Sequence, residues 1–353
     1  MPENFVSGKK NVLVTGGAGF IGSHLCEKLV KNNHVLCLDN FSTGQESNID
    51  HLIQNPDFKF IKHDITEPID LEKSREAQMF KIEFQGIQEI YHLACPTSPK
   101  EYNKYPIETL LANSYGVKNT LDLAIKYKAK FLFSSTDAVY GEPQPNQEPF
   151  KEDYWGYVNH LGPRGCYDEG KRFAETLIVN HRKKFNIDTK IARIANTFGP
   201  LMRLDDGRVI PDYINSALKG KPILIHGDQN TVSTFLYISD LIDALTKMMA
   251  SSEPGPINIG SAEEYRLEDI AKQIIDLAGS KSKTAFEAPP PYTTVQNVPD
   301  LTLVKEKLGW FPLVKLEEGL KETIEKMRGA KVIKPLTPFD IVGAPQPKEE
   351  EDE

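Results

Sequence analysis

The stretch "VTGGAGFIGSHL" is the feature that most constrains the fold of this chain. Gly16, Gly19 and Gly22 stand at G-x-x-G-x-x-G spacing, and Gly17 with the last two also satisfies G-x-G-x-x-G. Glycines after a strand let the backbone approach a pyrophosphate, whose charge meets the free N–H groups of a helix starting near Phe20. The spacing predicts a dinucleotide-binding loop. A structural glycine turn in another kind of α/β protein is the alternative.

The carboxylate that ends the next apolar run, "HVLCLD", indicates which dinucleotide is bound. Asp39 stands where a carboxylate accepts both ribose hydroxyls of NAD and repels the 2′-phosphate of NADP. The sequence therefore favours NAD. Asp64 ends the following run, "FKFIKHD", where it would contact the adenine or simply cap a helix. The sequence leaves both roles open.

Six apolar runs predict the strands of a sheet. They occupy residues 11–16, 34–39, 58–64, 89–94, 130–135 and 189–195. The runs do not alternate between apolar and polar residues, which is typical of parallel strands buried on both faces. Helical periodicity separates them, as with Ile21, Leu25 and Leu29. We predict an α/β fold with a doubly wound parallel Rossmann sheet and a smaller mixed α/β cap domain.

The pattern loosens after Gly199 into short mixed elements, which predicts that the cap shares chain segments with the Rossmann domain. The predicted boundaries are 1–199 and 229–262 for the Rossmann domain, 200–228 and 263–330 for the substrate-binding cap, and 331–353 for a C-terminal extension. The last residues, "KEEEDE", predict an acidic, disordered tail.

Composition excludes several classes of function. The net charge of −8 argues against nucleic-acid binding, although a local basic pocket could still hold one phosphate group. No apolar run approaches the roughly 20 residues of a membrane helix, and we expect a cytoplasmic protein without a membrane role. Cys26, Cys37, Cys95 and Cys166 form no C-x-x-C pair, so we expect reduced, structural thiols and no metal site.

A second constellation, "CYDEGKRFAETL", places Tyr167 and Lys171 four residues apart, on one face of a helix. An ammonium beside a phenol favours the phenolate, and a bound nicotinamide cation would favour it further, so Tyr167 could act as a base on a carbinol. A Tyr-x-x-x-Lys pair alone is usually an ordinary surface pair. Together with the glycine loop and Thr136, at the end of "FLFSST", it predicts a reaction centre.

The chain resembles the extended short-chain dehydrogenase/reductase (NAD-dependent epimerase/dehydratase) superfamily over residues 9–330. More narrowly, it resembles the UDP-glucuronate decarboxylase (UDP-xylose synthase) branch. The resemblance rests on "VTGGAGFIGSHL", "LDNFSTG", "HDITEP", "YHLACPTSP", "EDYWGYVN", "GPRGCYDEGKRFAETL", "NTFGP", "DDGRVIPDYI" and "LGWFPLVKLEEGL" in this order. It implies that C4 of a nucleotide sugar is oxidised by tightly held NAD, that chemistry follows beside the ketone, and that C4 is reduced again.

The resemblance also implies a role for each matched residue. Tyr167 would take the 4-hydroxyl proton, Lys171 would lower the pKa of Tyr167 and hold the nicotinamide ribose, and Thr136 would hydrogen-bond the reacting oxygen. The implied cofactor shell, in addition to Tyr167 and Lys171, is Gly16, Gly19, Phe20, Ile21, Asp39, Asn40, Thr43, Gly44, Asp64, Ile65, Leu93 and Asn113. Asn196, Arg208 and Tyr237 would hold the nucleoside diphosphate of the sugar, a UDP-sugar in this branch. A homodimer formed by the helix around 106–127 and the Tyr167 helix is also implied.

Four positions depart from the pattern of the branch. Ala138 stands in place of a Glu on the C5 side of the sugar, and Leu201, Ser233 and Asn297 stand in place of arginines. An arginine fork binds a carboxylate or phosphate through two hydrogen bonds, so these changes affect the substrate and not NAD. Either Arg203 and Arg164 compensate, or the substrate differs, or turnover has been lost.

The sequence thus predicts an NAD-dependent enzyme that acts through a transient 4-keto sugar, with decarboxylation of UDP-glucuronate to UDP-xylose or its 4-keto form favoured. A 4-epimerase is the first alternative, because it needs no group at C5 and accepts Ala138. A 4,6-dehydratase fits less well, since its T-D-E strand end matches Asp137 but lacks the Glu. A non-catalytic NAD-binding homologue is the remaining alternative.

Overall fold

The computed structural model describes residues 8–144, 148–204, 206–290 and 298–332. Asn297, one of the four departures, lies outside the described residues, and so does the predicted acidic tail.

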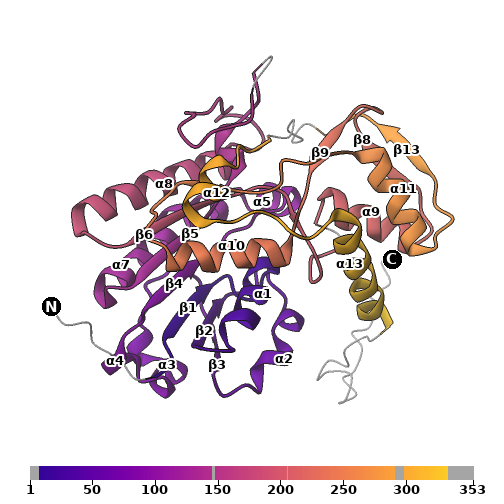
Figure 1. Cartoon of the computed structure of the whole chain (residues 1–353). Coiled ribbons are helices and arrows are strands. Elements are labelled where there is room, and N and C mark those ends of the chain that lie inside the picture. The colour runs from indigo at the N-terminus through magenta and orange to yellow at the C-terminus, as the bar shows by residue number, and fades with distance from the viewer. Residues whose placement is uncertain (1–7, 145–147, 205, 291–297, 333–353) are drawn as a thin grey trace, which may run out of the picture.

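A central sheet of seven parallel strands forms the core of the molecule (Figure 1). Across the sheet the strands are β11 Ile257–Ile259, β6 Thr189–Ile194, β5 Lys130–Thr136, β4 Glu89–His92, β1 Asn11–Thr15, β2 His34–Asp39 and β3 Phe58–Lys62. The six predicted strands all occur, within two residues of the predicted ends. The order places β1 in the middle, so both the glycine loop and the end of β5 lie at the carboxyl edge of the sheet, and the doubly wound prediction is confirmed.

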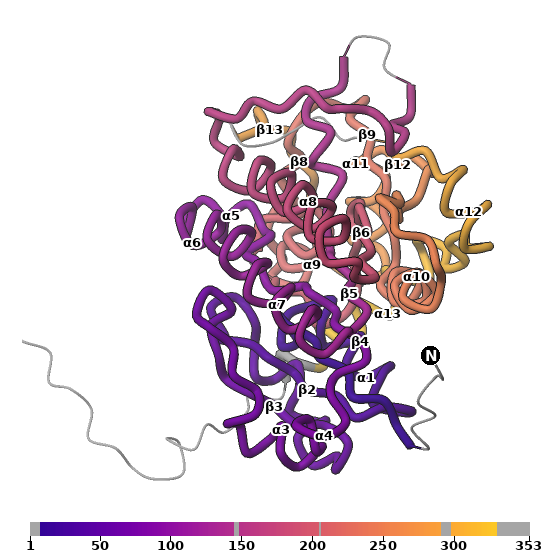
Figure 2. Tube along the Cα trace, turned by 90° about the vertical axis from the view of Figure 1, so that its left-hand side faces the viewer, coloured from indigo at the N-terminus to yellow at the C-terminus, as the bar shows by residue number. Residues whose placement is uncertain are grey.

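Helices cover both faces of this sheet. α1 Phe20–Leu29 and α10 Ile238–Ala250 lie on one side, and α7 Val117–Tyr127 and α8 Gly165–Phe185 lie on the other (Figure 2). Two separate apolar cores lie on the two sides of the sheet. Along β2, Val35 belongs to the core that contains residues of α1 and α10, and Leu36 belongs to the core that contains residues of α7 and α8. Neither face of the strand meets water, which explains why its sequence shows no alternation.

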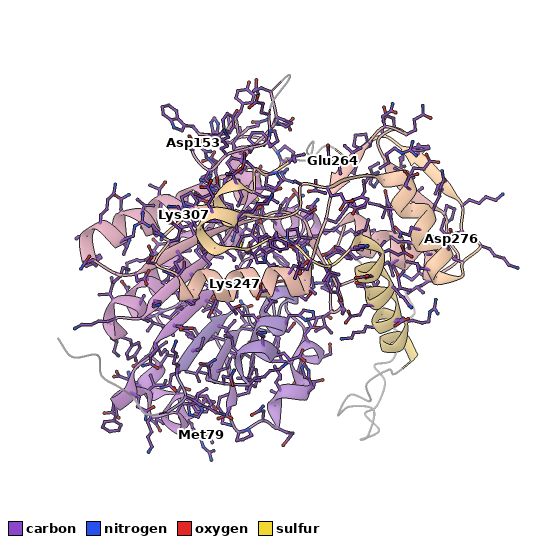
Figure 3. All side chains as sticks on the ribbon, in the orientation of Figure 1. Met79, Asp153, Lys247, Glu264, Asp276 and Lys307 are labelled. Atoms are coloured by element: carbon purple, nitrogen blue, oxygen red, sulfur yellow. The ribbon has the colours of Figure 1, made fainter. Side chains whose placement is uncertain are left out.

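Short elements connect the strands. They are η1 Glu46–Asn48, α2 Asp50–Ile53, η2 Leu71–Lys73, α3 Arg75–Met79, α4 Ile82–Gln85, α5 Pro99–Lys104, α6 Pro106–Leu111, the π-helical turn η3 Ala112–Gly116 and the 3₁₀ turn η4 Asp137–Tyr140. The polar segment 73–85, predicted as a loop or short helix, contains α3 and α4. Met79 of α3 lies on the outer surface (Figure 3).

A smaller unit of mixed elements packs beside the sheet, at the right of Figure 1. It contains α9 Val209–Leu218, β8 Ile223–His226, β9 Val232–Thr234, β12 Glu264–Arg266, α11 Leu267–Ala278, β13 Thr284–Glu287 and α13 Leu316–Val332. β8 pairs with β13, and β9 pairs with β12. Between this unit and the sheet lie β7 Thr197–Phe198 and β10 Leu236–Tyr237, whereas α12 Thr302–Leu308 packs against the edge strand β11 and against α10. Within the described ranges, no helix is both long and apolar enough to cross a membrane.

Candidate active site

The glycine loop connects β1 to α1, and its conformation distinguishes the two possible registers. Gly16 has φ +72°, and a β-carbon on it would lie 2.7 Å from the backbone nitrogen of Ala94. A β-carbon on Gly22 would lie 2.1 Å from the carbonyl oxygen of Gly16. Gly19 is the N-cap of α1 and offers no side chain to the free N–H groups. The tight turn is therefore made by the Gly16, Gly19 and Gly22 register.

Asp39, at the end of β2, is tied to this loop. Its Oδ2 accepts a hydrogen bond from the Ala18 N–H (3.0 Å) and its Oδ1 accepts one from the Phe41 N–H (2.8 Å). Burial raises the pKa of Asp39, and these backbone hydrogen bonds oppose the shift. The carboxylate is thereby held rigidly beside the loop, where the ribose of a dinucleotide would lie.

Asp64 takes part in a turn as well as in the site. Its Oδ1 accepts hydrogen bonds from the Thr66 N–H (2.9 Å) and hydroxyl (2.7 Å), and its Oδ2 accepts one from the Asn40 amide (2.9 Å). Burial acts to raise the pKa of Asp64, but these hydrogen bonds outweigh it and lower the pKa. No helix begins at Asp64, so the helix-capping alternative is wrong, and the side chain closes a turn instead. The contact with the adenine stays a prediction.

A cavity of about 420 Å³ opens at the carboxyl edge of the sheet. Most of the predicted cofactor shell lines it, namely Gly16, Gly19, Phe20, Ile21, Asp39, Asn40, Thr43, Gly44, Asp64, Ile65 and Leu93. Asn113 lies outside the lining, and its buried amide donates to the Thr109 carbonyl (2.9 Å) and to Cys95 Sγ (3.1 Å). A glycine cradle without room for β-carbons, a free helix N-terminus and a buried ribose-facing carboxylate fit NAD.

The predicted catalytic pair lies on one face of α8, beneath this cavity. Lys171 is 2% exposed, donates to the Ser134 carbonyl (2.8 Å) and lies 5.9 Å from the centre of the Tyr167 ring. Burial lowers the pKa of Lys171, whereas Cys95 and Glu175 raise it. Burial raises the pKa of the Tyr167 phenol far above its ordinary range, and a hydrogen bond from Thr136 acts in the opposite direction. In the protein alone, Tyr167 is therefore a neutral phenol near neutral pH.

Tyr102, which the sequence did not single out, completes the surroundings of Tyr167. Its ring stacks on that of Tyr167 with 5.1 Å between centres and 13° between planes. The guanidinium of Arg164 lies 5.8 Å from the centre of the Tyr102 ring and pairs with Asp168 (3.1 Å). The stack restrains the plane of the Tyr167 ring. No spacing in the sequence predicts it, because α5 meets α8 only in the folded chain.

The end of β5 brings Thr136 to the same place. The Thr136 hydroxyl donates to Asp137 Oδ1 (3.0 Å) and accepts from the Ala138 N–H (3.2 Å). Ala138 is buried and packs with Tyr102 and Tyr167. The three predicted catalytic residues, Thr136, Tyr167 and Lys171, thus lie close together at the carboxyl end of β5.

Charged pairs line the other end of the cavity. Arg208, immediately before α9, pairs with Asp206 (3.2 Å) and donates to the Thr97 hydroxyl (2.8 Å). Arg203 pairs with Glu101 (2.8 Å). All five residues line the cavity. Each of these arginines is therefore already matched with a carboxylate of the protein, which the sequence did not predict.

The other predicted substrate residues lie away from the cavity lining. Asn196 is exposed, and its amide donates to the Ser233 hydroxyl (3.4 Å). Tyr237 is buried, and its ring packs beside Gly319 of α13. Leu201, in place of an arginine, does line the cavity. Among the described residues, no group of three or more His, Cys, Asp or Glu side chains is placed to hold a metal ion.

The parallel sheet, the glycine cradle and the buried tyrosine and lysine pair define an NAD-binding α/β protein with a site for carbinol oxidation. A comparison with known families gives the particular class. Residues 12–260 match the model of the NAD dependent epimerase/dehydratase family, and the chain belongs to that family. The resemblance drawn from the motifs is confirmed, and NAD is the cofactor of the family.

Curated relatives extend over nearly the whole chain. UDP-glucuronic acid decarboxylase 1 of Xenopus tropicalis is 41% identical over 330 residues, which cover 93% of this chain and 75% of the relative. UDP-glucuronic acid decarboxylase 5 of Arabidopsis thaliana is 40% identical over 328 residues, 92% of each chain. The predicted similarity to the decarboxylase branch is confirmed.

The solved structures with the same fold include epimerases. UDP-glucuronic acid 4-epimerase from Bacillus cereus, in complex with UDP-glucuronic acid and NAD, superposes with a TM-score of 0.78 at 30% identity, covering 90% of this chain and 99% of that chain. UDP-glucose 4-epimerase from Thermotoga maritima gives 0.79 at 29% identity, covering 91% and 99%.

Proposed function

We propose that this protein oxidises C4 of UDP-glucuronate with bound NAD, releases carbon dioxide beside the resulting ketone, and yields UDP-xylose or its 4-keto form. The observation that carries the proposal is the position of Thr136 and of the Tyr167 and Lys171 pair beside the cavity, where Lys171 donates to the carbonyl of Ser134, a residue of the cavity lining. The names of the curated relatives support the choice of substrate.

Bound NAD supplies a hydride acceptor, which later returns the hydride. The residues proposed to hold it are the eleven that line the cavity, together with Asn113, Tyr167 and Lys171. The free N–H groups at the start of α1 face the pyrophosphate, and Asp39 binds the adenine ribose.

The protein groups move the proton of the carbinol. Tyr167 accepts the 4-hydroxyl proton while the hydride leaves C4, and Thr136 hydrogen-bonds the same oxygen. Lys171, anchored to the Ser134 carbonyl, supplies a positive charge that favours the phenolate once a cationic nicotinamide lies alongside. Loss of carbon dioxide then requires little from the protein, because the 4-ketone makes the C5 carboxylate part of a β-keto acid.

The far end of the cavity is proposed to hold the UDP group. Arg208 projects into the cavity while it is held by Asp206 and Thr97, and a diphosphate would complete its hydrogen bonds. Arg203 is the second candidate, and Asn196 and Tyr237 remain predictions for the nucleoside. The proposed domain boundaries assign Arg203 and Arg208 to the cap.

A second candidate function is 4-epimerisation of a UDP-sugar. The specific observation is Ala138, which leaves no carboxylate at the buried position beside Tyr102 and Tyr167. An epimerase needs no group on the C5 side, because the ketone only has to turn over before hydride returns. The solved neighbours include two 4-epimerases.

We further propose that the protein is a cytoplasmic homodimer. α6, η3 and α8 expose large apolar side chains, namely Ile107, Leu110, Leu111, Tyr115 and Phe173, which a second copy would cover. The four cysteines are free thiols, which suits a reducing compartment.

The test is incubation of the purified protein and NAD with UDP-glucuronate, UDP-glucose, UDP-galactose and UDP-xylose, followed by mass spectrometry and NMR. Release of carbon dioxide from UDP-glucuronate is the expected result. An isomer of unchanged mass would favour the epimerase, and loss of water would favour a dehydratase. Binding of NAD without turnover of any sugar would reject both enzymatic proposals.

A further inference from the structure

Arg193, on β6, is the centre of a buried hydrogen-bond network beside the proposed reaction site. Its side chain is 11% exposed and forms two hydrogen bonds with Glu175 of α8, from Nε to Oε1 (3.0 Å) and from Nη2 to Oε2 (2.8 Å). The Ser135 hydroxyl donates to the same carboxylate, and Ser135 and Arg193 are partners across β5 and β6. One carboxylate of α8 is therefore held by groups from two neighbouring strands.

This carboxylate lies one helical turn after the catalytic lysine. Lys171 donates to the carbonyl of Ser134, and Glu175 accepts from the hydroxyl of Ser135. Two consecutive residues of β5 thus receive side chains four residues apart on one face of α8. The Lys171 ammonium cannot move along β5 unless the contacts of Glu175 break as well.

The same guanidinium also holds the turn that follows Thr136. Its Nη1 donates to the Tyr140 hydroxyl (3.0 Å) and to the Glu152 carbonyl (2.9 Å), and it lies 4.8 Å from the centre of the Tyr140 ring. Tyr140 ends η4, and its hydroxyl donates to Asn258 Oδ1 (2.6 Å). Arg193 therefore connects the helix that carries the tyrosine and lysine pair to the turn that begins after Thr136.

We propose that Arg193 and Glu175 are positioning residues that hold Tyr167 and Lys171 of α8 in place opposite Thr136 of β5. Neither Arg193 nor Glu175 belongs to the cavity lining, so both act through other residues. The effect on rate rests on the proposed C4 oxidation, but it does not depend on whether decarboxylation or epimerisation follows.

Glu175 has a second effect, because the other titratable groups around the Lys171 ammonium are uncharged near neutral pH. Burial raises the pKa values of the Tyr167 phenol and the Cys95 thiol, and it lowers the pKa of His92 to about 3. Burial also lowers the pKa of Lys171, whereas Cys95, once ionised, and Glu175 raise it. In the described part of the chain, Glu175 is thus the carboxylate that favours the charged form of this buried amine.

The decisive variant is Glu175→Gln, which keeps the size of the side chain and removes its charge. The measurement is kcat for UDP-glucuronate with bound NAD as a function of pH. The alkaline limb of the profile, where Lys171 loses its proton, should move to lower pH by about one pH unit. Near neutral pH, kcat should fall about 10-fold because the helix face is less well held, while KM and NAD affinity stay unchanged.

Two variants separate position from charge. Arg193→Lys keeps the positive charge but loses the paired hydrogen bonds of the guanidinium, so kcat should fall while the alkaline limb stays at the wild-type pH. Asp122→Asn removes a carboxylate from an exposed pair with Lys118 on α7 and should change neither. An unmoved alkaline limb in Glu175→Gln would overturn the charge effect, and wild-type kcat in Arg193→Lys would overturn the positioning role.

Breaking a buried ion pair costs stability, so Ser135→Ala supplies a milder change to the same clamp. It removes one hydrogen bond from the Glu175 carboxylate and leaves the ion pair with Arg193 in place. We expect kcat to fall about threefold with an unmoved alkaline limb. An unchanged kcat would count against the clamp.

A second measurement needs no substrate and separates the inference from the proposed function. NMR of the NAD-bound protein with ¹³Cε-labelled lysine follows the titration of Lys171, whose signal is assigned by its absence in Lys171→Met. In Glu175→Gln, Lys171 should lose its proton at lower pH than in the wild type. If no sugar reduces NAD, the proposed function fails while this titration still tests Glu175. Identical titrations in the two proteins would overturn the charge effect.

Discussion

The two ends of the cavity differ in the groups that line them: mainly backbone groups at one end and charged side chains at the other. At the cofactor end, backbone N–H groups, three glycines and one carboxylate held by backbone hydrogen bonds form the site. At the sugar end, side chains from α5 and from the segment before α9 meet as ion pairs, Arg203 with Glu101 and Arg208 with Asp206. The departure Leu201 lies at the second end, whereas Ala138 is buried beside Tyr102 and Tyr167.

The difference shows where such a fold can change its reaction. A backbone cradle is bound to the path of the chain, so altering it disturbs β1 and α1 as well as the cofactor. Side chains on the rim can be exchanged while the sheet stays intact. Substitutions at the sugar end can therefore alter the substrate without disturbing the cofactor end.

The largest effect is expected for Tyr167→Phe, which removes the proton-transferring hydroxyl from the point where the two ends meet. Turnover should fall at least about 1,000-fold, while NAD still binds because the glycine cradle is untouched. Steady-state rates and NAD fluorescence titration check both parts. Tyr157→Phe, at a tyrosine that is 63% exposed, should leave both unchanged. Substantial turnover in Tyr167→Phe would refute the assigned chemistry.

Gly22→Ala tests the cofactor end. The added methyl would meet the Gly16 carbonyl oxygen at 2.1 Å, so we expect a loss of about 3 kcal/mol in unfolding free energy and loss of NAD binding. The matched control is Gly329→Ala in α13, where nothing lies within 4 Å of the added carbon. It should gain roughly 0.5–1 kcal/mol. Urea unfolding and NAD titration measure both, and a tolerated Gly22→Ala would contradict the close approach.

Asp137→Asn should stabilise the fold. The folded pKa of about 6 lies above the ordinary value of 3.8, so the folded state binds the proton more tightly than the unfolded state does. Stability is therefore lost as the pH rises through this window, and Asn removes that loss. The variant should be more stable by at most about 3 kcal/mol above pH 6 and equal to wild type below pH 4. Melting temperatures across this range provide the measurement, and a variant less stable at neutral pH would argue against the burial cost.

Arg208→Ala tests the sugar end and should have the smallest effect. Removing a part-exposed arginine from a diphosphate should raise KM about 10-fold with little change in kcat. NAD affinity and the central sheet should be unaffected. Arg266, whose exposed pair with Asp269 lies on the surface of the cap, is the control, and Arg266→Ala should keep the wild-type KM. An unchanged KM in Arg208→Ala would remove this residue from the substrate site.

Much of the fold and the cofactor end could be predicted because their signals are local. Strands buried on both faces lack alternation, and glycines with a following carboxylate mark the turn around a pyrophosphate. Tyr167 and Lys171 share a helix face, so their spacing alone brings them together. By contrast, Tyr102 was missed and Tyr237 packs against α13, because contacts between distant elements leave no periodicity in the sequence.

The sequence by itself determined the sheet, the dinucleotide loop, the preference for NAD and the pairing of Tyr167 with Lys171 on one helix face, since each depends on residues close together in the chain. Only the tertiary structure decided which glycines make the tight turn, which arginines are already paired, and that the Tyr102 ring stacks on Tyr167. Those outcomes depend on burial and on atoms brought within hydrogen-bonding distance by packing. Ion pairs and ring stacks between distant segments form only when folding brings those segments together.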